Sequence, residues 1–326
     1  MSSPDRSLPD IDLLVIGDCN PDVLVLGEDV TPAFGQQEKL VERVALEVGG
    51  SASITAVAAA RLGLRVALAA VIGADPAGAF MLGQLAREGV DTSGVLVRDD
   101  LATGMTVALS RGGDRAILTA LGAIDALTAA DVPSGLLARA RHVHVSSYFL
   151  LAGSLGPGLA GLLAAARAAG AVTSLDTNWD PSGRWRDPYL PAVLAQASLL
   201  LPNEAEALAL SGAASLDTAV SSLAGGGSRL VVKLGPRGAR CASQSGTCQV
   251  SLPPVTPVDT TGAGDCFNAG LIAGLLQGWP LPRAAALGCA TGALSTGALG
   301  GTAGAPGLAA AVALAADAVT GCPGTG

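Results

Sequence analysis

Two patterns of hydrophobic spacing alternate along this chain from one end to the other. Short, largely apolar runs such as 12–16 and 66–72 predict buried strands. Other segments, such as 52–62 and 75–88, carry apolar residues at helical spacing. Because strands alternate with helices throughout, the sequence predicts an α/β fold in which a mostly parallel central sheet is covered by helices on both faces.

One segment departs from this alternation. Residues 95–119 alternate apolar and polar side chains and are broken by glycine-containing turns at 103–104 and 112–113, which predicts the hairpins of a small sheet. Together with residues 21–47 they are expected to form a lid, since lids commonly exclude water from group-transfer reactions. An edge hairpin without a lid role is the alternative. No internal repeat or linker is present, so residues 1–326 are expected to form a single domain.

Composition and charge exclude several classes of function. No run of eighteen or more residues is free of charged and turn-forming side chains, so no membrane-spanning helix is predicted. Residues 1–10 lack the apolar run of a signal peptide, which favours a cytoplasmic location. The net charge of -8 argues against a nucleic-acid partner, which would need a basic face. The six cysteines form no C-x-x-C pair, so we expect buried small residues rather than a zinc site or a disulfide framework.

The strongest chemical signal is the stretch 259–270, which reads Asp-Thr-Thr-Gly-Ala-Gly-Asp-Cys-Phe-Asn-Ala-Gly. The helical spacing after it predicts a glycine loop that opens a helix. Gly262, Ala263 and Gly264 leave backbone amides unshielded, and the first amides of a helix have no partner within it, so an anion can bind there. We expect the same helix dipole to keep Asp265 ionised at neutral pH.

An anion cradle beside a carboxylate base is what phosphoryl transfer to a hydroxyl requires. In this interpretation Asp265 accepts the proton, and the amides of residues 262–265 stabilise the charge on the transferred group. The alternative is that Asp265 only caps the helix and the glycines only form a turn.

Other nucleotide-binding motifs are absent or misplaced. The only two lysines, Lys39 and Lys233, do not follow Gly-x-x-x-x-Gly, which excludes a P-loop. Residues 156–161 match the Gly-x-Gly-x-x-Gly of a dinucleotide site, and Asp176 follows at a fitting distance. However, residues 147–155 separate the first glycine from its strand, and the chain has 44 glycines. An NAD-dependent oxidoreductase is therefore the disfavoured alternative. The only two histidines, in the predicted strand at 142–145, have no visible partners for a metal site and are expected to be structural.

The stretch 259–270 closely resembles the signature of the ribokinase-like carbohydrate kinases, also called the phosphofructokinase-B family. Residues 49–51 and the helix after them resemble the first signature of that family, although Ile54 stands where an asparagine is usual. The resemblance covers about residues 12–315. It implies a ribokinase-like fold with a small β lid and an ATP-dependent kinase that uses Mg²⁺, with potassium as a further cation and a homodimer formed through the lid sheet.

The resemblance also implies roles for individual residues, with Asp265 as the base and Gly262, Ala263 and Gly264 as the anion hole. Substrate contacts are expected from Asn20, Asp22, Gly49, Gly50, Ser51 and Asp265; nucleotide contacts from Asn203, Lys233, Gly235, Arg237, Gly238, Gly262 and Gly264; and metal contacts from Glu206, Asp259 and Thr261. Without the resemblance, Asn20 and Asp22 are equally well explained as turn formers, Asn203 as a helix cap and Glu206 as part of a solvated helix face.

The charges expected around the substrate indicate its class. Asp180 stands where relatives that phosphorylate sugar acids have an arginine, and Asp22 adds a second negative charge. Both would repel an anion. Ile54 cannot make the hydrogen bonds of the usual asparagine, so we expect either a less polar substrate edge or a different mode of substrate binding there. We therefore expect transfer to the primary hydroxyl of a neutral sugar or polyol, with a nucleoside as the alternative.

Overall fold

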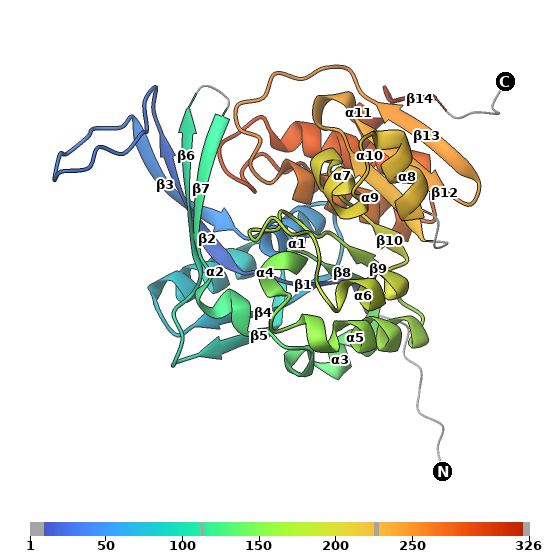
Figure 1. The fold of residues 1–326 in the computed structure, drawn as a ribbon, viewed down its shortest axis with the longest axis horizontal. Coiled ribbons are helices and arrows are strands. Elements are labelled where there is room, and N and C mark those ends of the chain that lie inside the picture. Colours follow the sequence, from blue (N-terminus) through green and yellow to red (C-terminus); the bar gives the residue numbers. More distant parts are fainter. Residues whose placement is uncertain (1–9, 112–113, 225–227, 322–326) are drawn as a thin grey trace, which may run out of the picture.

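The computed structural model describes residues 10–111, 114–224 and 228–321. Its centre is a ten-stranded sheet in the order β14-β13-β12-β11-β10-β9-β8-β1-β4-β5 (Figure 1). The seven strands from β11 to β5 pair in parallel, and the last three pair antiparallel. The strands are β1 (Ile11–Ile16), β4 (Val66–Gly73), β5 (Asp91–Arg98), β8 (Ala140–Val145), β9 (Val172–Leu175), β10 (Leu199–Leu200), β11 (Arg229–Lys233), β12 (Ala239–Ser243), β13 (Gly246–Ser251) and β14 (Val319–Gly321).

Helices cover both faces of this sheet, as expected from the sequence. One core cluster lies beneath α3 (Ser134–Arg139), α4 (Tyr148–Leu151), α5 (Gly156–Ala168), α6 (Leu190–Gln196), α7 (Glu204–Ser211) and α8 (Leu216–Ala224). Two more lie on the opposite face beneath α1 (Ser51–Arg61), α2 (Pro76–Arg87), α9 (Ala263–Leu276), α10 (Leu281–Ser295) and α11 (Leu308–Ala315). Every residue of β1 and β4 is buried, because strands in the middle of a helix-covered sheet have no solvent-facing side.

A second, four-stranded sheet has the order β3-β2-β6-β7 and projects from the main body (Figure 1). It consists of β2 (Asn20–Leu26), β3 (Arg43–Gly49), β6 (Met105–Arg111) and β7 (Asp114–Ala120). The β2/β3 and β6/β7 pairs are antiparallel, and β2 and β6 pair in parallel. This small sheet contains most of the two segments in which lid strands were expected.

The expected start of the second lid segment at residue 95 is wrong. Residues 95–98 belong to β5, which pairs with β4 in the large sheet. Because β5 is the edge strand of that sheet, part of it stays exposed, and its sequence alternates as a lid strand does. The turn expected at 112–113 lies outside the described residues.

The cysteines agree with the expectation in four cases. Cys19, Cys241, Cys266 and Cys289 are free and buried. Cys248 contradicts it, since this residue is disulfide-bonded. A disulfide depends on the distance between two Cα atoms in the fold, which a missing C-x-x-C pattern does not reveal.

No single helix in the described part of the chain is long and apolar enough to cross a membrane. The bent pair of α7 and α8 meets the criterion of length and composition only when the two helices are taken together.

Candidate active site

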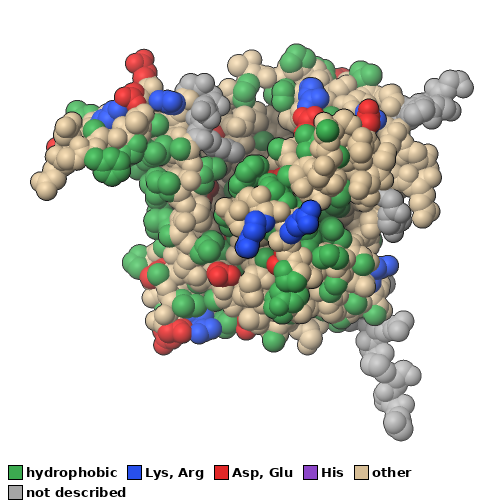
Figure 2. All heavy atoms as spheres, in the orientation of Figure 1, with side chains coloured by type: hydrophobic (Ala, Val, Ile, Leu, Met, Phe, Trp, Pro, Cys, Tyr) green, Lys and Arg blue, Asp and Glu red, His purple; other side chains and the backbone are tan. Residues whose placement is uncertain are grey.

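A cavity of about 690 Å³ lies where the carboxyl ends of the parallel strands meet the small sheet and the start of α9. Ligands bind at this edge of the sheet in open α/β folds. Most of the side chains and glycines expected at a site line this cavity: Asn20, Asp22, Gly50, Ser51, Asn203, Glu206, Lys233, Gly235, Gly238, Thr261, Gly262, Ala263, Gly264 and Asp265. The space-filling view shows the hollow between the small sheet and the helical body (Figure 2).

Three expected site residues do not line the cavity. Gly49 lies behind Asp22, because a Cβ added to this glycine would sit 1.9 Å from the Asp22 Oδ1. Arg237 pairs with Glu204 at the surface. Asp259 holds the loop before α9: its Oδ1 accepts hydrogen bonds from the Thr261 amide (2.9 Å) and hydroxyl (2.8 Å). Potassium at Asp259 and Thr261 stays a prediction.

The anion cradle is built by the turn into α9. Gly262 precedes the helix with φ 71°, in the left-handed region that favours glycine. Its Cα faces Ile54 and Gly301 so closely that an added Cβ would lie 2.9 Å from the Ile54 Cγ2 and 2.8 Å from the Gly301 Cα. Ile54 is 3% exposed. This side chain therefore packs against the loop that carries the amides, in addition to lining the cavity as expected.

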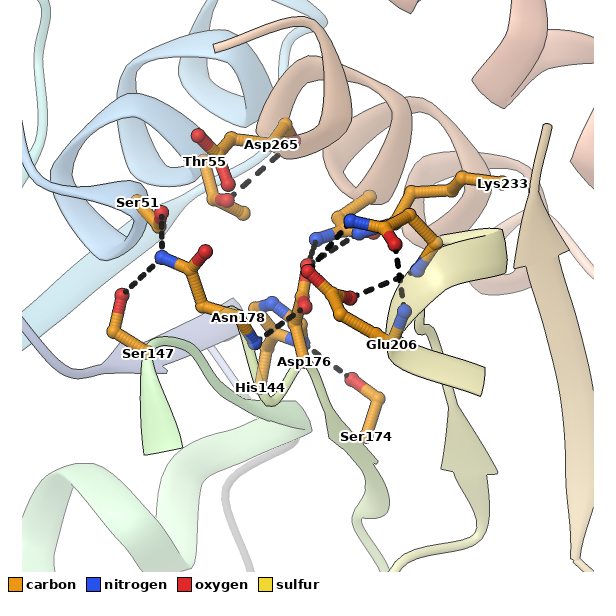
Figure 3. A network of polar contacts seen from close by, with 12 residues as sticks. Ser51, Thr55, His144, Ser147, Ser174, Asp176, Asn178, Glu206, Lys233 and Asp265 are labelled. Atoms are coloured by element: carbon orange, nitrogen blue, oxygen red, sulfur yellow. Dashed lines mark hydrogen bonds and ion pairs between the residues drawn. The ribbon is translucent and has the colours of Figure 1, made fainter. Parts of the chain in front are cut away.

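Asp265 lies in the first turn of α9 and lines the cavity. Its backbone carbonyl accepts a hydrogen bond from the Thr55 hydroxyl (Figure 3). We expected the helix dipole to favour the ionised form of Asp265, which would lower its pKa. The direction of this expected pKa shift is wrong. Burial among the cavity walls and the negative charges of Asp176 and Asp18 raise the pKa of Asp265 well above its ordinary value, and Lys233 opposes this only in part. A base with a raised pKa accepts a proton more readily than an ordinary carboxylate does.

The side of the cavity formed by the small sheet carries a row of polar groups that crosses three strands. The register places Asp22 of β2 beside Thr106 of β6, and Thr106 beside Thr119 of β7. The Asn20 amide donates to Asp22 Oδ1 and to Thr106 Oγ1, each at 3.3 Å, and the hydroxyls of Thr106 and Thr119 are 3.1 Å apart. Ala108 lies two residues beyond Thr106 on β6 and belongs to the next row of this sheet, which is apolar.

Sequence reasoning missed Thr106 and Thr119, because only the pairing of β2 with β6 brings them to Asp22. It also missed Asp18, which accepts hydrogen bonds from the amides of Ser51 (3.0 Å) and Ala52 (2.9 Å) at the start of α1. The only signal available was the position of Asp18 in the loop two residues after the first strand.

Asn178 is a further residue that was not expected. Its side-chain amide donates to the hydroxyls of Ser51 (3.2 Å) and Ser147 (3.3 Å), as Figure 3 shows. Asn178 and Ser147 both have positive φ, 55° and 57°, and are therefore held in a backbone conformation that is uncommon for these residues.

Lys233 ends β11 inside a buried polar network (Figure 3). Its ammonium lies 2.5 Å from the Asp176 carboxylate. Asp176 also accepts a hydrogen bond from the Asn268 side chain, at 2.6 Å. Asp176 and Glu206 raise the pKa of Lys233 although burial opposes the charge, so the ammonium is retained.

Asn203 and Glu206 form a capping box at the start of α7, as proposed for Asn203 when the family resemblance is set aside. The alternative for Glu206, a solvated helix face, is wrong, because Glu206 is 4% exposed. Burial and the charge of Asp176 raise the pKa of Glu206 to about 7. Glu206 and Asn203 offer oxygen ligands of the kind that Mg²⁺ prefers, at the nucleotide side of the cavity.

Asp180 does not contribute the charge that we expected around the substrate. This residue is buried and does not line the cavity. Its carboxylate accepts hydrogen bonds from the Ser182 amide (2.8 Å) and hydroxyl (2.9 Å) and from the Trp185 amide (2.6 Å). Asp180 therefore stabilises its own turn.

The structure explains the two other candidate sites, the histidine pair of β8 and the glycine motif at 156–161, without a ligand. Both histidines bond to the Ser174 hydroxyl at 2.7 Å, and burial lowers the pKa of His144 to about 4. No group of three or more His, Cys, Asp or Glu suited to a metal occurs among the described residues. The glycines at 156–161 lie inside α5, and α4 intervenes between them and β8, so the turn of a dinucleotide fingerprint is not formed.

Comparison with known proteins gives consistent matches along the chain. A family model described as pfkB family carbohydrate kinase matches residues 10–307. A fructokinase of Klebsiella pneumoniae is 33% identical over 302 residues, which cover 86% of this chain and 95% of the relative. A 2-dehydro-3-deoxygluconokinase of Bacillus subtilis is 32% identical over 273 residues, covering 79% and 83%. The structure of a putative ribokinase II from E. coli in complex with ATP and Mg²⁺ superposes with a TM-score of 0.82 at 26% identity, covering 93% of this chain and 98% of that one.

Proposed function

The chain belongs to the pfkB family of carbohydrate kinases, and from this premise we propose that it transfers the γ-phosphoryl group of ATP to the primary hydroxyl of a small neutral sugar or related polyol. One observation carries the proposal. Asp265, the glycine turn that opens α9 and the polar row of the small sheet line the same cavity. The base, the anion hole and the acceptor groups are thus within reach of one bound substrate.

Each part of the cavity has a task in this reaction. Asn20, Asp22 and Thr106 bind the hydroxyls of the acceptor and orient one of them toward Asp265. Asp265 accepts the proton of that hydroxyl as its oxygen attacks the γ-phosphorus and the bond to the leaving ADP breaks. The amides of residues 262–265 and the Lys233 ammonium stabilise charge on the transferred group.

The nucleotide is proposed to lie along the side of the cavity formed by Gly235, Gly238 and the last turns of α10. Glu206 and Asn203 would hold Mg²⁺, whose charge offsets the charge of the phosphates when it is bound.

An ATP-consuming reaction of this kind is proposed to take place in the cytoplasm.

A neutral acceptor remains the proposal although Asp180 is not in the cavity. Carboxylates line it from several sides, namely Asp18, Asp22, Asp176, Glu206 and Asp265. Lys233 is the only basic side chain that lines it among the described residues, and no arginine does. An anionic acceptor would meet several like charges without a cation of its own.

A nucleoside is the second candidate, and the apolar row of the small sheet favours it. Beyond Thr106 and Thr119 the cavity wall continues with Ala108 and Ile117, and Leu150 also lines the cavity. A flat base could pack against these apolar side chains while the ribose hydroxyls reach the polar row.

A screen of ATP consumption against neutral sugars, polyols, nucleosides, sugar acids and sugar phosphates tests the proposal. We expect the highest kcat/KM for a neutral acceptor with a primary hydroxymethyl group. If 2-keto-3-deoxygluconate or fructose 1-phosphate is the best acceptor, the proposed substrate class is wrong.

The Thr106→Val substitution tests the polar row. It removes a hydroxyl while keeping the shape of the side chain, so we expect KM for the acceptor to rise about tenfold, the effect of losing one net hydrogen bond. The KM for ATP should not change. Ser110→Ala, on the same strand but outside the cavity lining, is the control. Equal effects of both substitutions on the acceptor KM would contradict a role for Thr106 in binding.

The outer face of the small sheet is proposed to form a homodimer. Because Thr106, Ala108 and Thr119 face the cavity, the side chains between them face away from it. On that outer face Val44 is 58%, Leu46 46% and Leu118 62% exposed. Figure 2 shows apolar side chains gathered over this sheet. A second copy with the same apolar face could cover these residues through a twofold axis.

Leu118→Glu is expected to convert the dimer to a monomer, because a charge on the covered face would have to lose its water. Light scattering after size-exclusion chromatography measures the mass. Val319→Glu places the same charge on another exposed apolar residue, far along the chain in β14, and should leave the dimer intact. A monomeric wild-type protein at micromolar concentration would contradict the proposed dimer.

A further inference from the structure

The floor of the cavity has more negative than positive side chains. Three carboxylates line it close to Lys233, namely those of Asp176, Glu206 and Asp265. All three interact electrostatically with the Lys233 ammonium. A bound nucleoside triphosphate brings further negative charge to the floor of the cavity. The position of this single ammonium therefore decides which negative group is stabilised.

The ammonium is held beside the start of α9. A Cβ built on Gly264, in the first turn of this helix, would lie 3.6 Å from the Lys233 Nζ. The positive charge thus adds to that of the helix N-terminus at the anion hole. No other cation reaches this position among the described residues that line the cavity.

Asp176 fixes the ammonium at this point. Asp176 directly follows β9, which β10 separates from β11, and its carboxylate lies 2.5 Å from the Lys233 ammonium. The Asn268 side chain donates to the same carboxylate oxygen at 2.6 Å. The other oxygen of Asp176 accepts a hydrogen bond from the Asn178 amide at 3.2 Å. Both oxygens are therefore engaged, and the carboxylate has little freedom to turn away.

Without Asp176 the lysine would have a different partner. Asp265 already interacts with the Lys233 charge, and both side chains line the same cavity. A lysine released from Asp176 would be drawn to the two remaining carboxylates, Glu206 and Asp265. An ion pair with Asp265 would weaken this residue as a proton acceptor and occupy the place where the acceptor hydroxyl must bind.

We propose that Asp176 is a positioning residue of the phosphoryl transfer, which holds the Lys233 ammonium against the first turn of α9 and away from Asp265. The proposal rests on the kinase function proposed above. Asp176 does not touch the reacting atoms in this account and acts only through the lysine.

A double-mutant cycle tests whether the two residues act as one unit. Lys233→Met removes the charge and is expected to lower kcat about a hundredfold, as the loss of one donor to the transition state does. Asp176→Asn should lower kcat to a similar extent with little change in the acceptor KM. The double variant should be no slower than Lys233→Met alone, because the task of Asp176 disappears with the lysine.

The control is Asp180→Asn, in the same loop. This carboxylate is also buried, but it binds only its own turn and does not line the cavity. We expect a loss of stability with kcat within about twofold of wild type, since an interaction that supports only the fold does not change the chemical step.

Asp176→Asn leaves a buried ammonium without its partner and could fail to fold. The comparison between Lys233→Met and the double variant then decides, because neither of them contains that unpaired lysine. The proposal predicts equal kcat values and equal affinity for a non-hydrolysable ATP analogue measured by calorimetry. A further tenfold loss of kcat in the double variant would show that Asp176 acts independently of Lys233 and would overturn the proposal. A wild-type enzyme that phosphorylates no acceptor would instead contradict the proposed function.

Discussion

Replacement of Asp265 by asparagine is expected to lower kcat by about three orders of magnitude or more, the size of effect associated with a general base. Asparagine keeps the size of the side chain and its place in the first turn of α9, but it cannot accept the proton of the acceptor hydroxyl. The affinity for an ATP analogue should stay close to that of wild type or improve. The substitution removes one of the negative charges that face the phosphates.

The pH dependence of the wild-type enzyme belongs to the same prediction. Since Asp265 must be deprotonated to act, kcat/KM should rise with pH through the pKa of this residue. Burial and neighbouring carboxylates raise that pKa, so the acid limb should lie well above the ordinary value of 3.8. An Asp265→Asn variant with near-normal kcat, or an acid limb below pH 4, would contradict the role of Asp265 as the base.

Gly262→Ala is expected to lower kcat about a hundredfold, as a displacement of the anion hole by about 1 Å would. The added methyl group would lie 2.8 Å from the Gly301 Cα and 2.9 Å from the Ile54 Cγ2. One of these neighbours is backbone, so the loop before α9 has to shift. Thermal unfolding should also show a loss of stability of about 1–2 kcal/mol from the positive φ alone.

The matched control for this substitution is Gly63→Ala. Gly63 also has a positive φ, 88°, but an added Cβ meets nothing within 4 Å and the residue does not line the cavity. It should lose stability to a similar extent while its kcat stays within about twofold of wild type. A comparable fall in kcat for both variants would mean that strain anywhere in the fold slows the enzyme and that the geometry at Gly262 has no special role.

The large sheet could be predicted from the sequence because its strands and helices have distinct hydrophobic spacings. Strand β1 and helix α1 lie within one residue of the expected ranges, and the small sheet was also anticipated. Residues 95–98 were placed in the wrong sheet, since an edge strand and a lid strand share the same alternation. Cys248 shows the same limit, because a disulfide partner is chosen by the fold rather than by local spacing.

Within the candidate site, the sequence predicted the groups that are close together in the chain. The amides and carboxylate of residues 262–265 lie within one turn, so their arrangement follows from the sequence. Thr106 became visible only when β2 was paired with β6. Asp176 stood out in the sequence only as part of a dinucleotide motif, and its contact with Lys233 appears only in the fold. Asp180 was misjudged because sequence position does not tell which way a carboxylate points.

The pKa of Asp265 was misjudged for a related reason. The helix dipole that should favour the ionised carboxylate can be read from the sequence, but the burial and the neighbouring carboxylates that outweigh it come from other parts of the fold.

We propose that this cavity transfers a phosphoryl group to a hydroxyl with Asp265 as the base, and identification of the reaction product tests this directly. ³¹P NMR of the reaction of wild-type enzyme with ATP, Mg²⁺ and the best neutral acceptor should show ADP and a phosphate monoester in equal amounts, with the ester on the primary carbon. The Asp265→Asn variant should form neither at a comparable rate. ADP with free phosphate and no ester, or equal ester formation by the variant, would contradict the account.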